Sequence, residues 1–297
     1  MAPGDRVTHA GHVQFGDELL LGPGTPYRWQ SLSGWEESPA LDSGTVNRSD
    51  GHGAYPGRLL AQPRTITLDG IVIRTEPAQM SRAVRALSAA TALCDDEVPL
   101  VVRLDAGPAL LSWARCLRRA VPVGTGGYGV GVVQGAALQW EATDPRRYSL
   151  TERQIEARLP RAEPGLDWSN SLAWPLDWGA PGATGALPVL NEGDAPAHPL
   201  ITFRGPVERP SLTNIGTGDA VEYDLALADG DELLVDTAAG TVTLNGAASR
   251  LYTATNRSAP EQTFTFPPGA SDLAFRAAPG SSDPRASAVV RYRSAYW

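Results

Sequence analysis

Hydrophobic and polar residues alternate over short stretches in the first half of the chain, a pattern that predicts β-strands. Within residues 63–74, Ile66 and Leu68 fall on one face and threonines on the other, and the phase resets at Asp69-Gly70, as at a turn or bulge. Glycine and proline bound the other alternating segments, as is typical of strands. The strands predicted in this half are 16–21, 26–32, 63–74, 98–104, 109–118 and 129–143.

One segment of the first half has helical periodicity instead. Its inward positions are spaced i, i+4, i+7 and i+11, while Arg82 and Arg85 fall on another side. Thr75 can cap the start, and Pro77 is tolerated in a first helical turn. The inward positions are Met80, Val84, Leu87 and Thr91. We therefore expect a helix over 76–94 that packs this face onto the sheet.

Residues 156–195 show no sustained period and are dense in proline, glycine and tryptophan. Trp168, Trp174 and Trp178 lie within eleven residues of each other, and each tryptophan favours the burial of a large apolar surface. We expect an extended connector that anchors its tryptophans on neighbouring domains or subunits. An aromatic platform for a sugar is the alternative interpretation.

From residue 198 to the end, short strands alternate with turn signals such as Asp229-Gly230 and Asn245-Gly246. This density predicts an antiparallel β-sandwich or jelly roll. The predicted strands are 198–204, 207–215, 220–227, 231–236, 240–245, 263–266, 271–277 and 286–293. The predicted organisation is an N-terminal domain over 1–155, the connector over 156–195 and a C-terminal sandwich over 196–297.

Composition narrows the range of functions. A chain of 297 residues favours two domains, and 42% apolar residues are enough for ordinary cores. The net charge of −8 leaves no excess of cations to offer nucleic acid or an anionic membrane. No apolar run approaches the ~18 residues of a membrane span, and the N-terminal residues lack the apolar core of a signal peptide. We expect a soluble protein that is not exported.

Residues that carry chemistry are sparse. The four histidines, His9, His12, His52 and His198, form no metal-binding or catalytic spacing. Asp229-Gly230-Asp231 is more simply a hairpin turn than part of a calcium loop.

The remaining candidates also favour a structural interpretation. The glycine-rich stretch 124–131 is followed by strand residues, so a hairpin is predicted and not a phosphate-binding loop. Cys94 and Cys116 are too few for a disulfide framework or a zinc site; two buried free thiols are expected, and a single bridge stays open. We therefore predict no enzyme activity and no catalytic, cofactor-binding or metal-binding residues.

Three motifs of the first half, taken in order, resemble the distal tail protein (Dit) family of long-tailed, siphovirus-type bacteriophages. They are His52-Gly53-Ala54-Tyr55-Pro56-Gly57-Arg58, then Arg64-Thr65-Ile66-Thr67-Leu68-Asp69-Gly70, then Trp140-Glu141-Ala142-Thr143-Asp144-Pro145-Arg146-Arg147-Tyr148. A strand that ends in Asp-Pro-x-x-Tyr recurs at the end of this family's ring domain. The Trp-rich connector departs from the family, so its role is not implied by the resemblance.

The C-terminal half is similar to the galectin-like β-sandwich that such proteins carry outside their ring. The matching segments are Asn191-Glu192-Gly193-Asp194-Ala195-Pro196, His198-Pro199-Leu200-Ile201, Leu234-Val235-Asp236-Thr237, Val242-Thr243-Leu244-Asn245-Gly246 and Val290-Arg291-Tyr292-Arg293. The fold implied is mainly β: a β-barrel or split-sheet ring domain with one packed helix, followed by an antiparallel sandwich.

The resemblance implies a structural virion protein that forms a ring, expected to be hexameric, at the distal end of the tail tube. Its partners would be copies of itself, the tail tube protein, a tail hub or tail-associated lysin-type protein and, as a further candidate, the tape measure protein. It would be assembled in the host bacterial cytoplasm and be located at the tail tip or baseplate. DNA would pass through the lumen without specific recognition.

Two alternatives stay open at this stage. One is a carbohydrate-binding β-sandwich protein for adhesion to the host surface. Phe264 and Phe266 of that half alternate in phase with burial, which favours core over a sugar platform. The other is an equivalent ring or hub subunit of a phage-derived injection machine.

Overall fold

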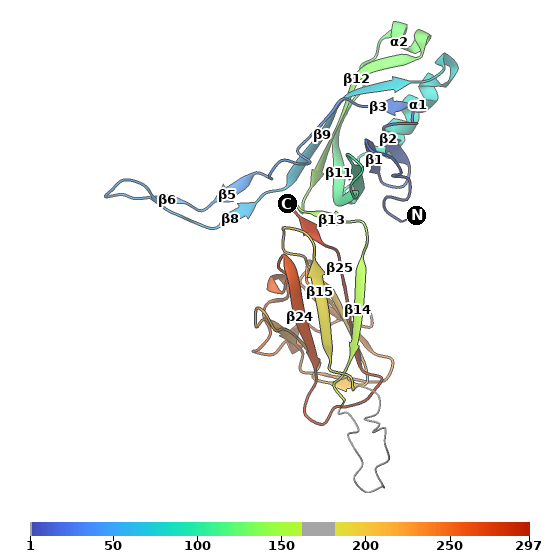
Figure 1. Ribbon diagram of the computed structural model, residues 1–297. Helices are drawn as coiled ribbons and strands as arrows, with labels where there is room; N and C mark the ends of the chain where they lie inside the picture. Colours follow the sequence, from blue (N-terminus) through green and yellow to red (C-terminus); the bar gives the residue numbers. More distant parts are fainter. Residues whose placement is uncertain (1, 162–181) are drawn as a thin grey trace, which may run out of the picture. The chain divides into compact units, whose positions relative to one another are not determined.

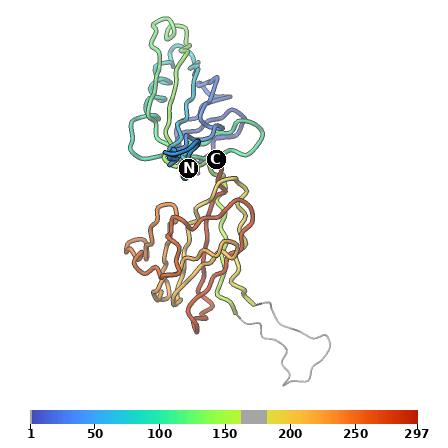
Figure 2. The backbone as a smooth tube through the Cα atoms, turned by 90° about the vertical axis from the view of Figure 1, so that its left-hand side faces the viewer, coloured from blue at the N-terminus to red at the C-terminus, as the bar shows by residue number. Residues whose placement is uncertain are grey.

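The computed structural model describes residues 2–161 and 182–297, so Trp168, Trp174 and Trp178 lie outside the described residues. Contacts divide the chain into two compact units. The first comprises residues 1–150 with Tyr296 and Trp297, and the second comprises residues 151–295. Figure 2 follows the chain through both units by colour. The predicted domain boundary at 155 lies five residues beyond this division.

The first unit is built on one antiparallel sheet with the strand order β2-β1-β10-β11-β12-β9-β3 (Figure 1). β13 pairs with β11 and β26, and β4 pairs with β9. The strands are β1 (His12–Phe15), β2 (Leu19–Leu21), β3 (Tyr27–Arg28), β4 (Ser31–Ser33), β9 (Arg64–Arg74), β10 (Val98–Arg103), β11 (Leu110–Ala120), β12 (Val132–Ala142), β13 (Arg147–Ser149) and β26 (Ala295–Tyr296).

A helix, α1 (Pro77–Ala90), covers the core of this sheet. Met80 and Leu87 are fully buried and Val84 packs against the same cluster, which confirms the predicted inward face. The predicted cap is wrong: Glu76 occupies the N-cap, so Thr75 lies one residue too early. The helix also ends at Ala90, before the predicted residue 94. Arg119 donates hydrogen bonds to the carbonyl oxygens of Ser88 and of the C-cap residue Thr91.

The glycine-rich stretch joins β11 and β12, which pair as the predicted antiparallel hairpin. Within the connection it forms a short helix, α2 (Thr125–Val130). The N–H groups of Gly127 and Tyr128 donate to the carbonyl of Gly124. Tyr128 packs against the core of the unit, and this contact supports a helix that its glycines alone would disfavour.

The second unit consists of two antiparallel sheets, with the orders β14-β25-β16-β21-β22-β23 and β15-β24-β18-β19, and a two-stranded ribbon of β17 and β20. Phe203 in β16 stacks on Phe275 in β24 with ring centroids 5.9 Å apart, so the two sheets pack face to face. The strands are β14 (Arg153–Arg158), β15 (Ala186–Asn191), β16 (Leu200–Arg204), β17 (Val207–Glu208), β18 (Ser211–Asn214), β19 (Ala220–Glu222), β20 (Ala226–Leu227), β21 (Glu232–Asp236), β22 (Thr241–Leu244), β23 (Ala248–Ser249), β24 (Gly269–Arg276) and β25 (Ser287–Tyr292).

Two details of this unit differ from the sequence-based expectation. β14 lies partly inside the range assigned to the connector and pairs with β25. β15 lies wholly inside that range and pairs with β24. The predicted strand 263–266 is absent: Glu261–Thr263 forms a 3-10 turn, η2, and Phe266 makes one bridge to Ala197. Phe264 and Phe266 are fully buried, as their alternation predicted. The predicted mainly β class, with a helix on the N-terminal sheet and a C-terminal sandwich, is confirmed.

Candidate functional site

A two-stranded arm projects from the first unit between β4 and β9 (Figure 1). We define the arm as residues 38–62. It contains two consecutive strand pairs, which are β5 (Leu41–Ser43) with β8 (Leu59–Ala61) and β6 (Val46–Asn47) with β7 (Ala54–Tyr55). The motif His52–Arg58 of the sequence analysis lies on the returning half of this arm.

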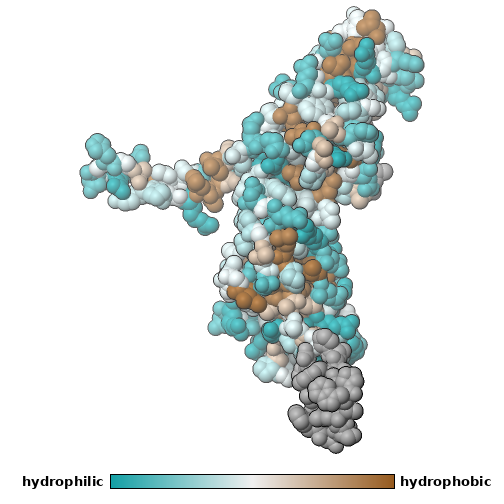
Figure 3. Space-filling model, viewed as in Figure 1, coloured by the Kyte–Doolittle hydropathy of each residue, from teal (hydrophilic) through white to brown (hydrophobic). Residues whose placement is uncertain are grey.

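The arm has no core of its own, and its large apolar side chains are at the surface (Figure 3). Leu41 and Leu59 share one face of the ribbon and Leu60 lies on the other, because Leu60 is paired with Asp42. An isolated two-stranded ribbon is only marginally stable in water. The apolar side chains of the arm, each between 55% and 66% exposed, are Leu41, Val46, Tyr55, Leu59 and Leu60.

Backbone contact between two glycines fixes the middle of the arm. The N–H of Gly44 donates to the carbonyl of Arg58 at 3.4 Å. A Cβ placed on Gly57 would meet the carbonyl carbon and oxygen of Gly44 at 2.2 Å, whereas a Cβ on Gly44 would stand 4.0 Å from Gly57 Cα. The two segments of the arm therefore pass each other at a distance that only glycine at position 57 allows. We call this contact between Gly44 and Gly57 the glycine crossing.

Arg64, the first residue of β9, anchors the base of the arm. The side chain is 2% exposed, and its Nη1 donates to the carbonyl oxygens of Gly34 (2.8 Å), Trp35 (3.1 Å) and Glu37 (2.6 Å). Its Nε donates to Pro145 O at 2.7 Å. One guanidinium thus ties the residues that enter the arm to the end of β12.

A second arginine lies beside this anchor. Arg147 Nη1 forms an ion pair with Glu36 at 2.8 Å, and its guanidinium lies 5.8 Å from the ring centroid of Trp35. Arg147 Nη2 also donates to the carbonyl oxygen of Trp297. Burial lowers the pKa of Arg64, and the positive charge of Arg147 lowers it further. The base of the arm is therefore held by two arginines, Arg64 and Arg147, and their hydrogen-bond partners, which together we call the arginine joint.

The turn that supplies Pro145 and Arg147 is held by Asp144. This carboxylate accepts hydrogen bonds from the N–H and the Nε of Arg146 at 3.1 and 2.8 Å, and from the hydroxyl of Tyr148. Burial, then the negative charge of Asp144, raises the pKa of Tyr148, so its hydroxyl stays a donor. The motif Asp144–Tyr148 therefore acts as a structural anchor for the arm.

The exposed face of β9 and β12 is polar. Thr65 lies opposite Glu141 and Thr67 lies opposite Gln139 in the antiparallel register. Arg115 on β11 pairs with Glu141 at 2.7 Å, so the charge at this position is compensated. Arg118 on β11 lies opposite Gln139 and is exposed, so this face carries charged as well as neutral polar groups.

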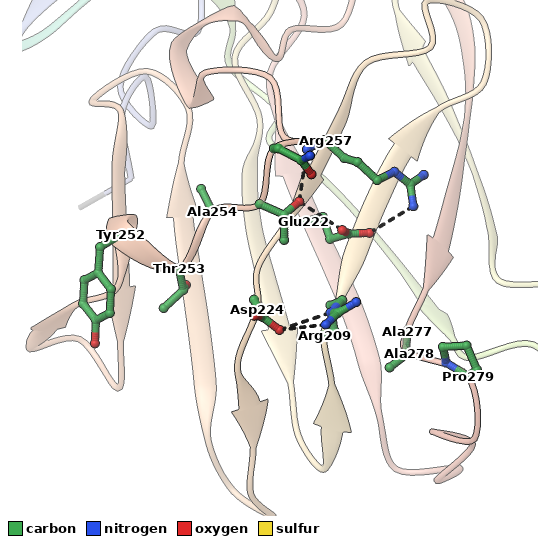
Figure 4. A pocket seen from close by; sticks show the side chains of 12 residues that line it. Arg209, Glu222, Asp224, Tyr252, Thr253, Ala254, Arg257, Ala277, Ala278 and Pro279 are labelled. Carbon is green, nitrogen blue, oxygen red and sulfur yellow. Dashed lines mark hydrogen bonds and ion pairs between the residues drawn. The ribbon is translucent and has the colours of Figure 1, made fainter.

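The second unit has an open groove with a volume of about 610 Å³. Figure 4 shows two ion pairs at its centre, Arg209 with Asp224 and Arg257 with Glu222, and Tyr252 on one side. The nitrogen–oxygen distances are 3.1 and 3.3 Å.

The residues that the sequence singled out do not converge on a reactive centre. Within residues 2–161 and 182–297, no group of three or more His, Cys, Asp or Glu side chains could hold a metal ion. His12 is buried, with ring nitrogens 3.2 Å from Thr8 N and 2.8 Å from Pro23 O. The described cysteines are free; Cys116 is buried, whereas Cys94 is exposed and not buried as expected. No described helix is both long and apolar enough to cross a bilayer.

Sequence reasoning missed the arm. Its strands are two or three residues long, too short for alternation to be recognised, and almost every arm residue is exposed. The available signal was the run of leucines, valine and tyrosine in a stretch otherwise rich in glycine, proline and polar residues. Such exposed apolar groups mark interaction surfaces.

Comparisons with known proteins agree with the resemblance. Residues 192–296 match the family model described as siphovirus-type tail component, C-terminal domain. The fold is similar to the Dit protein of phage SPP1, described as a paradigm of the hub adsorption apparatus in phages that infect Gram-positive bacteria. The two chains are 13% identical with a TM-score of 0.62, over 95% of this chain and 97% of that one.

A second similar structure is a chain of the phage P2 baseplate in its activated conformation with calcium. The identity is 10% and the TM-score 0.51, over 95% of this chain and 97% of that one. No curated protein matches the sequence. The predicted resemblance to the distal tail proteins is confirmed.

Proposed function

We propose that this chain is a structural subunit of the distal end of a phage tail. Residues 192–296 match the siphovirus-type tail component family, and the fold is similar to that of a distal tail protein over 95% of the chain. The subunit assembles with copies of itself into a ring that joins the tail tube to the tip or baseplate hub. A hexamer is the expected closure. The role is architectural and not enzymatic.

The observation that carries the proposal is the arm. Its apolar side chains lie on both faces of a ribbon that has no core, so burying them requires another surface. A projecting element that docks on a different surface of a neighbouring copy makes a heterologous contact, and repeated heterologous contacts close into a ring when the rotation allows it. The arginine joint supports this role because it fixes the direction of the arm before assembly.

The net charge of −8 supports a lumen through which DNA passes without being retained. In this arrangement the further partners are the tail tube protein on one side and a hub or lysin-type protein on the other, with the tape measure protein as a third candidate. The location is the tail tip of the virion.

The assignment of separate roles to the N-terminal and C-terminal domains, predicted from the sequence, remains a proposal. Residues 1–155 would form the ring and 196–297 an outer module. The second unit has its own face-to-face sheets and aromatic contacts. The anchoring role of the Trp-rich connector stays a prediction.

The glycine crossing supplies a sharp test of assembly. Gly57→Ala places a Cβ 2.2 Å from backbone atoms of Gly44, which cannot move aside as a side chain could, so the arm must open. We expect rings from the unmodified protein in negative-stain images and by light scattering, and monomers from Gly57→Ala. The melting temperature of the monomer should not change, because the arm contributes no core.

Gly44→Ala is the matched control, since its Cβ meets nothing closer than 4.0 Å. This variant should form rings at the concentration at which the unmodified protein does. An unmodified protein that stays monomeric at every concentration, or a Gly57→Ala variant that assembles normally, would overturn the proposal.

A further inference from the structure

The groove of the second unit has the chemistry of a sugar-binding site, and we propose that it binds a neutral oligosaccharide. This activity is separate from ring assembly, because every residue of the groove lies in the second unit and none lies in the arm. Its volume of about 610 Å³ falls in the range of sites for small organic ligands.

The frame of the groove is rigid. The N–H of Asp224 donates to the carbonyl of Thr253 at 2.7 Å, and the N–H of Thr255 donates to the carbonyl of Glu222 at 3.0 Å. Tyr223, between the two groove carboxylates, is buried in the core and bridges to Ala254. The segment after Tyr252 is therefore hydrogen-bonded to residues 222–224, at the end of β19 and just after it, and this pairing positions the backbone that carries the groove side chains.

Charge in the groove is balanced, which selects among ligand classes. Arg209 and Arg257 are each paired with a carboxylate, Asp224 and Glu222. The two carboxylates would repel a phosphate, and the two guanidinium groups would repel a divalent cation. A neutral hydroxyl-rich ligand suits the set, because vicinal hydroxyls can donate to carboxylate oxygens and accept from guanidinium N–H groups at the same time.

The carboxylate of Glu222 is held in place before any ligand arrives. The residue is buried, and its Oε1 accepts a hydrogen bond from the hydroxyl of Thr255 at 3.0 Å. Arg209 has a left-handed backbone, with φ of 48°, which non-glycine residues rarely adopt. Its Nε nevertheless donates to Asp224 at 3.1 Å. Backbone strain of this kind is concentrated at functional sites.

Tyr252 supplies the apolar surface that a pyranose needs. The residue is 78% exposed, and Figure 4 shows its ring on the side of the groove opposite Ala277, Ala278 and Pro279. The C–H face of a sugar ring packs on an aromatic face, while its hydroxyls reach polar groups at the rim. An aromatic body beside paired polar side chains therefore matches the two faces of a pyranose.

The test uses the full-length protein on a printed array of neutral, anionic and phosphorylated oligosaccharides, followed by calorimetric titration of the strongest neutral ligand. We expect binding to at least one neutral pyranose oligosaccharide. Tyr252→Ala should weaken that binding at least tenfold, Tyr252→Phe should retain it within about threefold, and Asp224→Asn should weaken it. Ile215→Ala, an exposed residue of the same unit outside the groove, is the matched control and should bind normally.

Ring formation, followed by electron microscopy of the same samples, separates this proposal from the assembly proposal. Tyr252→Ala should form rings like the unmodified protein, so a loss of sugar binding with intact rings supports the groove alone. Binding to no neutral oligosaccharide, binding only to phosphorylated or anionic ones, or binding that survives Tyr252→Ala and Asp224→Asn would overturn the groove proposal. Rings without sugar binding would leave the assembly proposal standing.

Discussion

Two antiparallel hairpins of this chain differ in where their side chains are buried. In the hairpin of β21 and β22 in the second unit, Leu233, Val235 and Val242 are at most 1% exposed. In the arm, the large apolar side chains are all at least 55% exposed. The first hairpin obtains its stability from the core beneath it. The arm keeps its shape through the glycine crossing and the arginine joint, and its apolar surface stays available to a partner.

The contrast separates folding from assembly. Side chains of the β21–β22 hairpin should affect the unfolding of the monomer, whereas side chains of the arm should affect only association.

Leu233→Ala should have the largest effect on folding. The residue is fully buried, so its truncation should lower the free energy of unfolding of the second unit by about 2–5 kcal/mol. Leu60→Ala, in the arm, should change the unfolding of the monomer by less than about 0.5 kcal/mol. Calorimetry of the monomers checks both values, and a comparable loss from the two variants would mean that the arm packs within its own chain.

Arg64→Met tests the joint. The substitution removes four hydrogen bonds to carbonyl oxygens, but it also removes Nη2, a buried donor for which the described residues provide no acceptor. These effects partly offset, so we expect a loss of about 2 kcal/mol in the first unit. We also expect ring formation to fail, because the arm loses its direction.

Arg74→Met is the control for the joint, at the exposed far end of the same strand. It should leave both the melting temperature and the rings unchanged. Normal rings from Arg64→Met would show that the arm finds its direction without the guanidinium.

The long strands and the helix could be predicted from the sequence because burial imposes a period on them. In β9, Ile66 and Leu68 alternate with exposed or half-buried threonines, and the 11-residue length makes the pattern visible. α1 has a similar signature, with Met80 and Leu87 inward. Each of these elements buries one face against its own unit.

The elements that were missed lack that period or have it in a misleading context. Arm residues such as Leu41 and Leu59 are not buried within the chain, so nothing in the monomer enforces alternation. β15 alternates cleanly, but it follows a stretch dense in proline, glycine and tryptophan that favoured a connector. The groove was missed because its residues, Arg209 and Tyr252 among them, are far apart in the sequence and converge only through strand pairing.

A paired substitution in the arm measures the assembly side of the comparison. Leu59→Ser with Leu60→Ser removes an apolar side chain from each face of the ribbon and should leave the unfolding of the monomer within about 0.5 kcal/mol. Association should weaken by about 1–3 kcal/mol, the range of well-packed interface residues. Sedimentation over a concentration series measures the shift.

Leu190→Ser, an exposed leucine of the second unit, is the control for the arm variant and should assemble normally. Equal weakening by both would mean that general surface hydrophobicity, and not the arm, drives association.

The smallest effect concerns the turns of the two regions. Gly246, in the turn between β22 and β23, has φ of 69°, and a Cβ added there would have no atom within 4 Å, so an added methyl group meets strain but no collision. Gly246→Ala should therefore lower the free energy of unfolding of the second unit by about 1 kcal/mol, the cost of a left-handed backbone for alanine.

Gly51, at the tip of the arm, is equally open and has no left-handed φ, so Gly51→Ala should leave both unfolding and rings unchanged. Denaturant titration resolves the difference, because a turn inside a cooperative sandwich contributes to its unfolding, whereas the tip of a coreless arm does not. A destabilised Gly51→Ala monomer would show that the arm folds as part of its unit and would remove the basis for treating it as an assembly element.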